Sequence, residues 1–402
     1  MTFKMLWCSD SWMLPTGYSQ VTRNILSNLF KAGVEVHNLA FQNVGFPSNM
    51  LVGERMVALY RMYYQLHPNE AYGNAGSVEF YNNEIKPDVT AFLADSFMLK
   101  WIADKITHEG KEITKRQKLH GKTLFYFPFD SHDVYDGVVP VMEQMDIKVA
   151  MSKYAQNLLK TKAKIDSHYI PHGVDPVIYR PLPKQIVKKV RDENKWGDKF
   201  VVGCIARNQS RKNLPALFKA FAEFSKDKKD TVLLMHCDPV DPQGTNLYDL
   251  AKKLGIESKV TYGMRRYSLG VPEFKITLAY NMMDIHALST TGEGFGLPII
   301  ESMACGVPNI CTNYTTAEEL IGKNGELVNL AKGHPHIAGQ LNTDRALVDI
   351  DDMVAKMNKL YDNPELRKKY SEAGRKHVLD NYGWERVCRM WMSLLEHGDT
   401  SV

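Results

Sequence analysis

Residues 289–301 read STTGEGFGLPIIE, and this stretch decides the architecture predicted for the second half of the chain. An apolar segment at 284–288 precedes it, and Pro298 suits the first turn of a helix, where backbone N–H groups have no partner within the helix. The pattern therefore predicts a strand, a glycine-containing loop and a helix. The free amides and the positive end of the helix dipole favour an anion at this loop, and the glycines let it approach the backbone.

Two carboxylates, Glu293 and Glu301, lie in the same loop and helix, and a phosphate site alone does not explain them. A carboxylate accepts two hydrogen bonds side by side and so suits a vicinal diol of a ribose or hexose, whereas the amides suit a pyrophosphate. Together these groups predict a site for a nucleotide sugar. The alternative is a well-capped core helix in which Glu301 only complements the helix dipole.

Seven residues separate Glu293 from Glu301 in the segment EGFGLPIIESMACGVP. This spacing resembles the Glu-x7-Glu signature of the retaining glycosyltransferases of family 4, which have the GT-B fold. The segment IPHGVD at 170–175, with Pro181 a few residues later, also resembles that family, and the likeness extends along nearly the whole chain. The resemblance implies an α/β protein with two Rossmann-like doubly wound domains that face each other across a cleft.

The length of 402 residues is too great for one ordinary core and predicts two domains of about 200 residues each. With the resemblance, it predicts an acceptor-binding domain at 1–178, a linker at 179–198 and a nucleotide-sugar-binding domain at 199–381. A terminal helix at 382–402 is expected to pack back on the first domain.

The formal net charge of +4 is small for this length and indicates no general role in binding nucleic acid. Two local basic clusters lie at 111–122, from Lys111 to Lys122, and at 184–195. They are either exposed, solvated helices or surfaces for an anionic partner. An anionic membrane is the partner considered for 111–122, and DNA as an acceptor is not excluded.

The six cysteines lie far apart or inside apolar segments and form no Cys-x-x-Cys pair for zinc or redox chemistry. They predict free thiols and therefore a reducing compartment. The N-terminal segment MTFKMLWCSD has no signal-peptide core, and no apolar run approaches the ~18 residues of a membrane span. We therefore expect a cytoplasmic protein, peripheral to the inner membrane face if 111–122 binds lipid.

The chain begins with an apolar strand at 4–8, a loop containing Gly17, a helix with apolar residues at helical spacing, and a second strand at 34–40. This order predicts the opening unit of a doubly wound sheet. The loop lacks the Gly-x-Gly-x-x-Gly spacing of nicotinamide enzymes. In the family that the chain resembles, this loop touches the phosphate or sugar of the donor, which makes Gly17 a donor-binding candidate.

Residues 41–86 are predicted to be an insertion and a helix rather than a strand. Met56, Leu59, Tyr60 and Tyr63 fall on one helical stripe. The aromatic residues of this segment either pack in the core or stack on a sugar acceptor.

The strand predicted at 123–127 ends in PFDSHD, and polar side chains at the carboxyl end of a parallel strand point into the ligand crevice. Many members of the family place a histidine near the reacting sugar after the strand that here ends at 94, but this sequence has Asp95 there. Asp130, His132 and Asp95 are therefore the candidates for the group beside the anomeric carbon. Asp130 ranks first because Pro128 holds it at a strand end, and His132 is alternatively an exposed loop histidine.

His172 follows the strand pattern that ends the first domain. It is interpreted either as a residue that lines the cleft or as a hinge residue held by backbone hydrogen bonds.

Strand and helix patterns alternate through the second half, with strands predicted at 200–206, 231–237, 259–263, 283–288, 307–311 and 326–329. The first of these strands leads into the basic loop RNQSRKN at 207–213. Arg207 and Lys212 occupy the positions where the family holds the donor pyrophosphate, and Arg211 is expected to face the solvent. The alternative for the loop is a solvated charge cluster.

Two fixed cations stabilise the negative charge that a diphosphate leaving group gains as the glycosidic bond breaks. They do the work of a metal ion, so no divalent cation and no cofactor is expected. His334 and His336 form a lone pair without a third ligand and do not indicate a metal site.

The resemblance also assigns Gly294, Phe295, Gly296 and Leu297 to donor binding, Glu293 to the donor sugar and Glu301 to the ribose. Residues 263–266 follow the strand after which the family binds the nucleobase through backbone groups. Contacts through backbone groups do not depend on side-chain identity, so the sequence does not distinguish the two bases. The donor is therefore either a UDP- or a GDP-sugar.

The predicted activity is retaining, metal-independent transfer of a hexose from such a donor to a hydroxyl group of a glycan, lipid-linked or other acceptor. A GT-B sugar-nucleotide epimerase and a non-catalytic nucleotide-sugar-binding protein are the alternatives.

Overall fold

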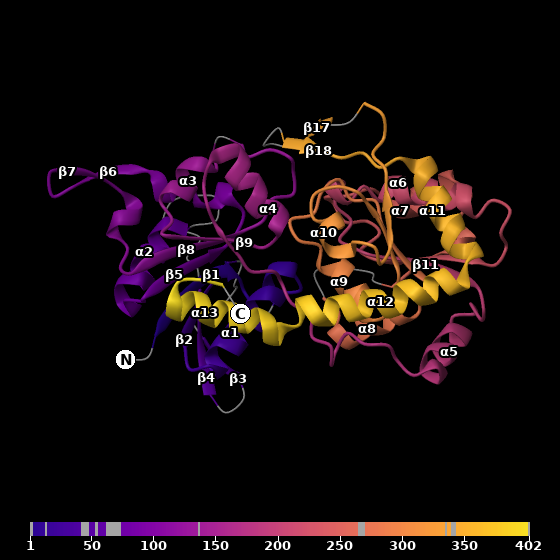
Figure 1. Cartoon of the computed structure of the whole chain (residues 1–402), viewed down its shortest axis with the longest axis horizontal. Coiled ribbons are helices and arrows are strands. Elements are labelled where there is room, and N and C mark those ends of the chain that lie inside the picture. Colours follow the sequence, from indigo (N-terminus) through magenta and orange to yellow (C-terminus); the bar gives the residue numbers. More distant parts are fainter. Residues whose placement is uncertain are drawn as a thin grey trace. The chain divides into compact units, whose positions relative to one another are not determined.

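The computed structural model describes residues 3–12, 14–41, 48–52, 55–61, 74–135, 137–263, 270–333, 336–338 and 343–400. The chain forms two compact units (Figure 1). Unit 1 comprises Met1–Phe129, Asp133–His172 and Trp384–Val402, and unit 2 comprises Asp130–His132 and Gly173–Gly383. The division between the units therefore follows His172, whereas the sequence pattern placed the end of the first domain at residue 178.

Unit 1 contains an eight-stranded sheet with the order β10-β9-β8-β5-β1-β2-β4-β3. Neighbouring strands are parallel except for β3 and β4, which are antiparallel. The strands are β1 (Lys4–Asp10), β2 (Glu35–Phe41), β3 (Ser48–Val52), β4 (Arg55–Arg61), β5 (Val89–Leu93), β8 (Lys122–Phe127), β9 (Ile147–Ala150) and β10 (His168–Tyr169). The helices of this unit are α1 (Gly17–Lys31), α2 (Asn74–Ile85), α3 (Val139–Glu143), α4 (Lys153–Leu158) and α13 (Trp384–His397).

The first strand and helix of unit 1 form where the sequence predicted them. Residues Met5 to Asp10 of β1 are all buried, as expected for a central parallel strand that is covered on both faces. The backbone N–H of Ser19 donates to Oγ1 of Thr16, which caps the N-terminus of α1. Gly33 follows the helix with a φ of +97°, a backbone conformation that favours glycine.

Helix α13 packs on unit 1 through Trp391. The indole ring of Trp391 is fully buried and meets the rings of Trp7 and Tyr126 edge to face, at centroid distances of 5.8 and 5.1 Å. Trp7 lies on β1 and Tyr126 on β8, so the C-terminal helix covers residues from the centre of the sheet. Aromatic pairs of this geometry contribute about 0.5–1.5 kcal/mol beyond the area that they bury.

The helix predicted around Met56 and Leu59 is wrong. Residues Arg55–Arg61 form strand β4, which pairs with β2 on one side and with β3 on the other. A short apolar run fits both the 3.6-residue period of a helix and the two-residue period of a strand. Here the pairing of this segment with neighbouring strands selects the strand. Tyr63 lies outside the described residues.

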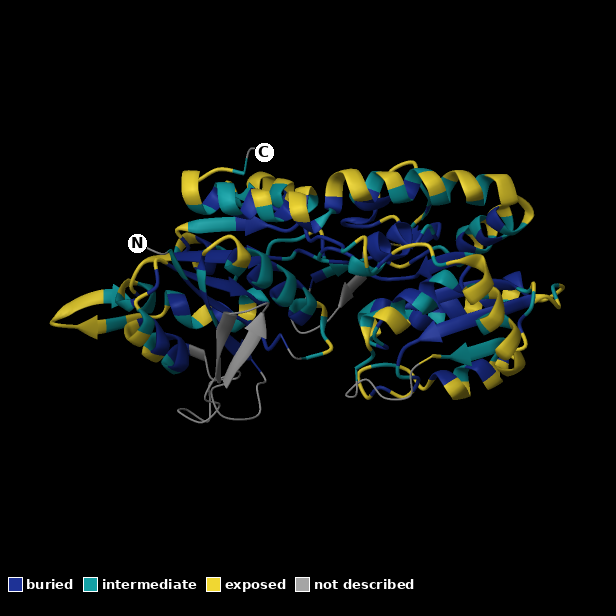
Figure 2. Cartoon of the chain, turned by 90° about the horizontal axis from the view of Figure 1, so that it is seen from below, coloured by how far each residue is buried: buried dark blue, intermediate teal, exposed yellow. Residues whose placement is uncertain are grey.

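The first basic cluster is also not a helix. Residues 111–122 contain strand β7 (Lys111–Thr114), which pairs with β6 (Lys105–His108), and then a 3-10 turn. Lys115 pairs with Asp104, Arg116 with Asp146 and Lys118 with Glu79. Figure 2 shows the β6–β7 hairpin as largely exposed. These ion pairs offset much of the positive charge that an anionic surface would meet.

Unit 2 contains a six-stranded, all-parallel sheet with the order β13-β12-β11-β14-β15-β16. The strands are β11 (Phe200–Ile205), β12 (Thr231–His236), β13 (Val260–Tyr262), β14 (Ile285–Leu288), β15 (Asn309–Thr312) and β16 (Glu326–Val328), with a separate hairpin of β17 (His336–Ala338) and β18 (Thr343–Arg345). The helices are α5 (Lys184–Glu193), α6 (Leu214–Phe224), α7 (Leu247–Lys253), α8 (Glu273–Asn281), α9 (Leu297–Ala304), α10 (Ala317–Ile321), α11 (Ile350–Asp362) and α12 (Pro364–Tyr382).

A buried polar network fixes the strand that leads into the stretch at 289–301. Nδ1 of His286 on β14 lies 2.8 Å from Oδ1 of Asn309 on β15, and Nδ2 of Asn309 lies 2.8 Å from Oγ of Ser302 on α9. Burial lowers the pKa of His286 to about 4, so the imidazole is neutral at pH 7. The network therefore ties β14, β15 and α9 together without a buried charge.

Candidate functional site

Two loops of unit 2 meet at the carboxyl ends of neighbouring strands. The loop at 206–213 follows β11 and the loop at 289–296 follows β14, and the two strands are paired in the sheet. The backbone N–H and the Oγ1 hydroxyl of Thr291 both donate to the carbonyl oxygen of Arg211, at 2.8 and 2.9 Å. Oγ of Ser289 donates to the carbonyl oxygen of Asn213 at 2.8 Å. The sequence predicted that these loops share a site, and the structure brings them together.

A buried ion pair joins the two loops. Nζ of Lys212 lies 2.5 Å from Oε1 of Glu293, and the two side chains are 9% and 7% exposed. Nη1 of Arg211 lies 3.5 Å from Oε2 of the same carboxylate and donates to the carbonyl oxygen of Gly292 at 3.2 Å. Arg211 faces the solvent, as expected, with its side chain 39% exposed, and its guanidinium also contributes to this cluster.

The cluster of Lys212, Arg211 and Glu293 carries one more positive than negative charge. Burial raises the pKa of the Glu293 carboxyl, but Lys212 and Arg211 together lower it further, so the net shift is downward. Burial and the nearby Arg211 lower the pKa of Lys212, against the opposing effect of Glu293. The carboxylate is therefore ionised at neutral pH, and the surplus positive charge favours an anionic ligand.

Arg207 lies in the same loop but has a different partner. Nε of Arg207 donates to Oδ2 of Asp241 at 2.8 Å, and the Asp241 side chain is 2% exposed. Burial raises the pKa of Asp241, but the hydrogen bond from Arg207 and its charge outweigh that effect and lower the pKa. The structure thus gives Arg207 a fixed orientation, and Asp241 is a supporting residue that the sequence pattern did not single out.

Glu301, the second carboxylate of the signature, lies in α9 and is buried. Its Oε2 accepts a hydrogen bond of 2.8 Å from the hydroxyl of Tyr280, which lies on α8. Burial raises the pKa of Tyr280, and the charge of Glu301 adds to this shift, so the phenol remains a donor. No local pattern connects Tyr280 to the signature, because only the tertiary packing brings α8 beside α9.

The predicted donor-binding residues between the two glutamates have clear structural roles. Gly296 is the N-cap of α9 and has a φ of +108°, which strongly favours glycine, and Leu297 begins the helix. Phe295 is buried, and its carbonyl oxygen accepts a hydrogen bond from Oγ1 of Thr316 at 2.5 Å. Gly294 lies between Phe295 and the buried Glu293.

Asp130 and His132 contact residues of the second half of the chain. Oδ2 of Asp130 lies 2.8 Å from Nη1 of Arg345, which also donates to the Asp130 carbonyl oxygen at 2.8 Å. A β-carbon on Gly292 would approach that carbonyl oxygen to 2.0 Å, so only glycine fits at this position. The ring of His132 lies against the ring of Tyr314, with a centroid distance of 4.2 Å. Asp130 is therefore held in place, and His132 is an exposed loop histidine whose ring packs on Tyr314.

In unit 1, Gly17 begins α1 and Asp95 accepts a hydrogen bond of 3.0 Å from the hydroxyl of Tyr18. Asp10 ends β1 and accepts a hydrogen bond of 2.6 Å from the hydroxyl of Thr16. Burial raises the pKa of Asp10, and the Thr16 hydroxyl only partly offsets this. Asp10 is a polar residue at a strand end that the sequence analysis did not select, although its position carried the same signal as that of Asp130.

His172 is buried, and its Nδ1 lies 2.7 Å from the hydroxyl of Tyr126 in unit 1. Burial lowers its pKa to about 3, so the ring is neutral. The Tyr126 hydroxyl therefore fixes the orientation of the ring.

The remaining predictions concern metals and membrane spans. Among the residues that the structure describes, no group of three or more His, Cys, Asp and Glu side chains could hold a metal ion, and His334 lies outside them. In the described part of the chain, no helix combines the length and hydropathy of a membrane span. All six cysteines are free thiols, as predicted. Residues 264–266 of the expected nucleobase segment also lie outside the described ranges.

Comparison with known proteins identifies similar sequences and folds. Residues 186–377 match the family model described as glycosyl transferases group 1. A GDP-mannose-dependent alpha-(1-6)-phosphatidylinositol monomannoside mannosyltransferase of Mycolicibacterium smegmatis is 27% identical over 225 residues, which are 54% of this chain and 52% of that protein. The match thus spans about half the length of this relative.

Two solved structures share the fold across the chain. Sucrose-phosphate synthase from Thermosynechococcus elongatus has a TM-score of 0.77 at 15% identity and covers 98% of each chain. HepE of Anabaena, in complex with UDP and glucose, has a TM-score of 0.70 at 16% identity and covers 98% of this chain and 99% of that chain. The predicted α/β fold of the GT-B class, with two parallel-sheet domains, is confirmed.

Because Glu293 pairs with Lys212, we expect the variant Glu293→Gln to lose free energy of unfolding by an amount that depends on pH. At pH 7 the variant leaves the Lys212 ammonium buried without its counter-ion, which costs about 3 kcal/mol of unfolding free energy. The folded-state pKa of Glu293 is lowered from 4.5, so its stabilising effect is present above that pH and is lost as the pH falls through the folded-state pKa. Urea unfolding should therefore show a difference from wild type that shrinks as the pH falls below 4.5.

Glu318→Gln is the matched control, because Glu318 is exposed on α10. It should unfold like wild type at both pH values. An equal loss of unfolding free energy for Glu293→Gln at pH 7 and at low pH would contradict a stabilising ion pair between Glu293 and Lys212.

Proposed function

Residues 186–377 belong to the group 1 glycosyl transferases, and from this premise we propose that the chain is a retaining, metal-independent glycosyltransferase of family 4. It moves a hexose from a UDP- or GDP-sugar to a hydroxyl group of a glycan or lipid-linked acceptor. The observation that carries this proposal is the buried Lys212–Glu293 pair with Arg211, at the carboxyl ends of β11 and β14. Ligands of open α/β sheets bind outside the carboxyl ends of the strands.

Each group of the site has a role in this proposal. Lys212 and Arg207 bind the diphosphate, Glu293 accepts hydrogen bonds from the hydroxyl groups of the donor sugar, and Glu301 accepts from the ribose. The surplus positive charge around Glu293 supports the diphosphate assignment, and the burial of Glu301 beside the Tyr280 hydroxyl supports a precise geometry for a diol. The relative from M. smegmatis is GDP-mannose-dependent, and HepE binds UDP. A screen for the donor should therefore include both guanosine and uridine diphosphate sugars.

The proposed reaction is a front-face substitution. The oxygen of the acceptor hydroxyl forms a bond to the anomeric carbon on the face from which the nucleoside diphosphate departs. The bond between that carbon and the β-phosphate oxygen breaks, and the departing phosphate oxygen takes the proton of the acceptor. Fixed cations stabilise the charge on the leaving diphosphate more strongly in the transition state than in the donor.

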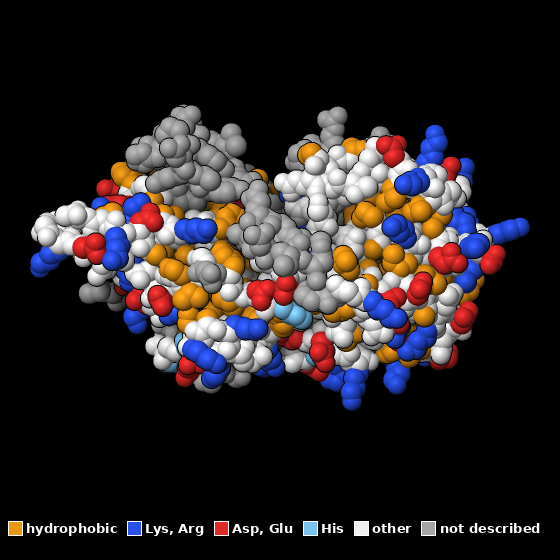
Figure 3. Space-filling model, turned by 90° about the horizontal axis from the view of Figure 1, so that it is seen from above, with side chains coloured by type: hydrophobic (Ala, Val, Ile, Leu, Met, Phe, Trp, Pro, Cys, Tyr) orange, Lys and Arg blue, Asp and Glu red, His pale blue; other side chains and the backbone are white. Residues whose placement is uncertain are grey.

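The working compartment is part of the same proposal. Six free thiols, five of them buried, fit a reducing environment such as the cytoplasm. A peripheral contact of residues 111–122 with an anionic membrane is weakened by the ion pairs of Lys115, Arg116 and Lys118. On the face in Figure 3, cationic and anionic side chains are interspersed.

A screen of UDP- and GDP-sugars by thermal shift, followed by assays for release of the nucleoside diphosphate, tests the activity. A ligand at 100 times its Kd stabilises the folded chain by ~2.7 kcal/mol. If the chain is a glycosyltransferase, the amount of nucleoside diphosphate released should rise with the amount of acceptor added. Conversion of the donor alone into an epimeric nucleotide sugar would establish the epimerase, and donor binding without turnover would establish the binding protein.

The variant Glu301→Gln should raise the KM for the donor by about tenfold or more, because a charged hydrogen bond to the ribose contributes roughly 1.5–3 kcal/mol. Steady-state kinetics at saturating acceptor measure this effect. Tyr280→Phe should have a smaller effect, since it removes only the hydroxyl that orients the carboxylate, and Glu318→Gln should have none. An unchanged donor KM in Glu301→Gln would overturn the ribose assignment.

The product should have the same anomeric configuration as the donor sugar. In the front-face route, the new bond forms on the face that the leaving group vacates. The coupling constant of the anomeric proton in the NMR spectrum of the product measures the configuration. A product of inverted configuration would contradict the assignment to a retaining family.

Turnover should persist in excess EDTA, because Lys212 and Arg207 supply the positive charge at the diphosphate. Lys212→Gln should lower kcat/KM by roughly 100-fold, the scale on which a lost transition-state hydrogen-bond donor acts. Activity that disappears in EDTA and returns with Mg²⁺ or Mn²⁺ would show instead that a metal ion holds the leaving group. Lys219→Gln, on an exposed part of α6, serves as the control for the loss of one charge.

A further inference from the structure

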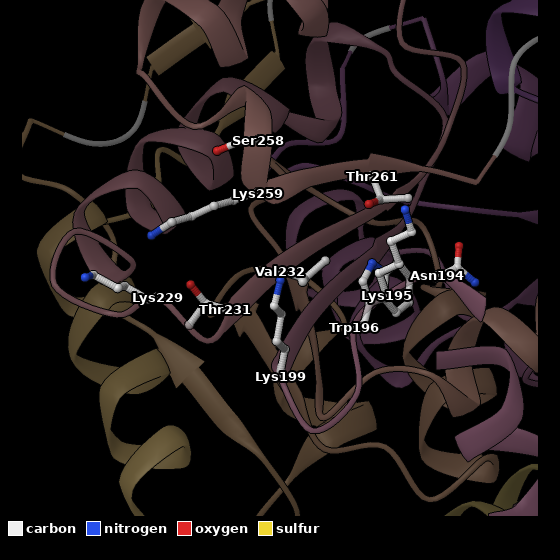
Figure 4. A pocket seen from close by; sticks show the side chains of 10 residues that line it. All are labelled: Asn194, Lys195, Trp196, Lys199, Lys229, Thr231, Val232, Ser258, Lys259 and Thr261. Carbon is white, nitrogen blue, oxygen red and sulfur yellow. The ribbon is translucent and has the colours of Figure 1, made fainter. Parts of the chain in front are cut away.

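A hollow of about 440 Å³ lies at the edge of the unit 2 sheet opposite to the Lys212–Glu293 site. Four lysines line it, namely Lys195, Lys199, Lys229 and Lys259 (Figure 4). The Lys212–Glu293 site follows the carboxyl ends of β11 and β14, whereas these lysines lie near the amino ends of β11, β12 and β13. The hollow is therefore separate from the proposed donor site, and we call it the lysine pocket.

The topology of the sheet explains why these side chains converge. Phe200 of β11 pairs with Thr231 of β12, and Leu233 of β12 pairs with Val260 of β13, so the three parallel strands begin side by side. Lys199, Lys229 and Lys259 lie immediately before or close to these three starting points. Lys195 comes from the turn after α5, next to the buried Trp196, which forms part of the wall.

One of the four lysines has a structural role. Nζ of Lys259 donates to the carbonyl oxygens of Ser225 and Lys228, which lie just beyond the end of α6. Such a contact satisfies carbonyl groups near a helix C-terminus and complements the helix dipole. This explanation does not extend to Lys195, Lys199 and Lys229, because their ammonium groups have no ion pair or hydrogen bond to any residue in the described ranges.

The charged residues that line the pocket are all lysines, and the nearest carboxylates lie outside the lining. None of the ten described residues that line the pocket is acidic. Asp230 follows Lys229 in the sequence, accepts hydrogen bonds from the hydroxyl of Tyr361, and lies near enough to Lys259 for its charge to act on that ammonium group. Asp227 lies near Lys259 and Asp198 is exposed beside Lys199. Like charges around one hollow repel each other, and the arrangement is favourable when an anion occupies the space between them.

We propose that the lysine pocket binds a small ligand that carries several phosphate groups. Ammonium groups are compact donors that bind phosphate oxygens as point charges, and cations on different sides of the pocket match more than one phosphate. Thr231, Ser258 and Thr261 add hydroxyl groups to the lining. The volume is that of a small-molecule site rather than of a surface for duplex nucleic acid. This inference does not depend on the proposed function.

Calorimetric titration of the full chain with sodium tripolyphosphate tests the proposal. The pocket variant Lys199→Gln/Lys229→Gln should bind tripolyphosphate more than roughly tenfold more weakly than wild type. The control Lys219→Gln/Lys323→Gln removes the same number of exposed charges outside the pocket and should bind like wild type. The variant Lys212→Gln weakens the proposed donor site, and its titration should still show tripolyphosphate binding to the lysine pocket.

Three outcomes would overturn the proposal. The first is equal weakening in the pocket variant and the control, which would indicate a general charge effect. The second is loss of all binding in Lys212→Gln, which would place the ligand at the donor site. The third is equal affinity for inorganic phosphate and tripolyphosphate, which would exclude a ligand with several phosphates. If the double variant does not fold, Lys229→Gln alone gives the test, because Lys229 is exposed.

Discussion

The buried ion pair between Lys212 and Glu293 is the interaction on which the geometry of the site depends. Removing two charges from water costs several kcal/mol per ion, so such a pair persists only where further groups support it. Here Arg211 adds a second cation, and its carbonyl oxygen binds Thr291 of the opposite loop. The loop after β11 therefore fixes the carboxylate, and the loop after β14 fixes the cations. This arrangement forms without a ligand, and such preorganisation lowers the entropic cost of binding for the proposed donor.

The sequence predicted the parts of this arrangement that follow from local pattern. Apolar strands, the Pro298 helix start and the order of strands and helices predicted doubly wound sheets. The resemblance to family 4 implied the GT-B fold, and the spacing of Glu293 and Glu301 indicated the site. The partners Tyr280, Asp241 and Arg345 were not found, because each is far from its contact in sequence and carries no local motif. Strand β4 was missed for a related reason, since its apolar residues fit two periods and only pairing with β2 selects one.

Charged side chains lie at both edges of the unit 2 sheet, and most of the cations among them have partners. At the carboxyl edge, the cations of Lys212, Arg211 and Arg207 each lie beside a carboxylate. At the amino edge, Lys259 and Lys228 donate to backbone carbonyl oxygens at or just beyond the end of α6, and Arg191 donates to the carbonyl oxygen of Met282 after α8. These contacts complement the dipoles of helices that end at this edge. Within the described ranges, Lys195, Lys199 and Lys229 make no such contact, and the proposed anionic ligand gives these three ammonium groups a common partner.

The contacts of Asp130 bear on the choice between two chemical routes. A double displacement needs a carboxylate free to attack the anomeric carbon. Arg345 binds both the carboxylate and the carbonyl oxygen of Asp130, and Lys212 and Arg211 occupy the carboxylate of Glu293. Carboxylates with these partners have fewer lone pairs available for attack, but they hold the surrounding cations in fixed positions. On the proposed assignment, these residues of unit 2 hold cations beside the leaving diphosphate. The front-face route requires such cations, since there the departing phosphate itself takes the proton.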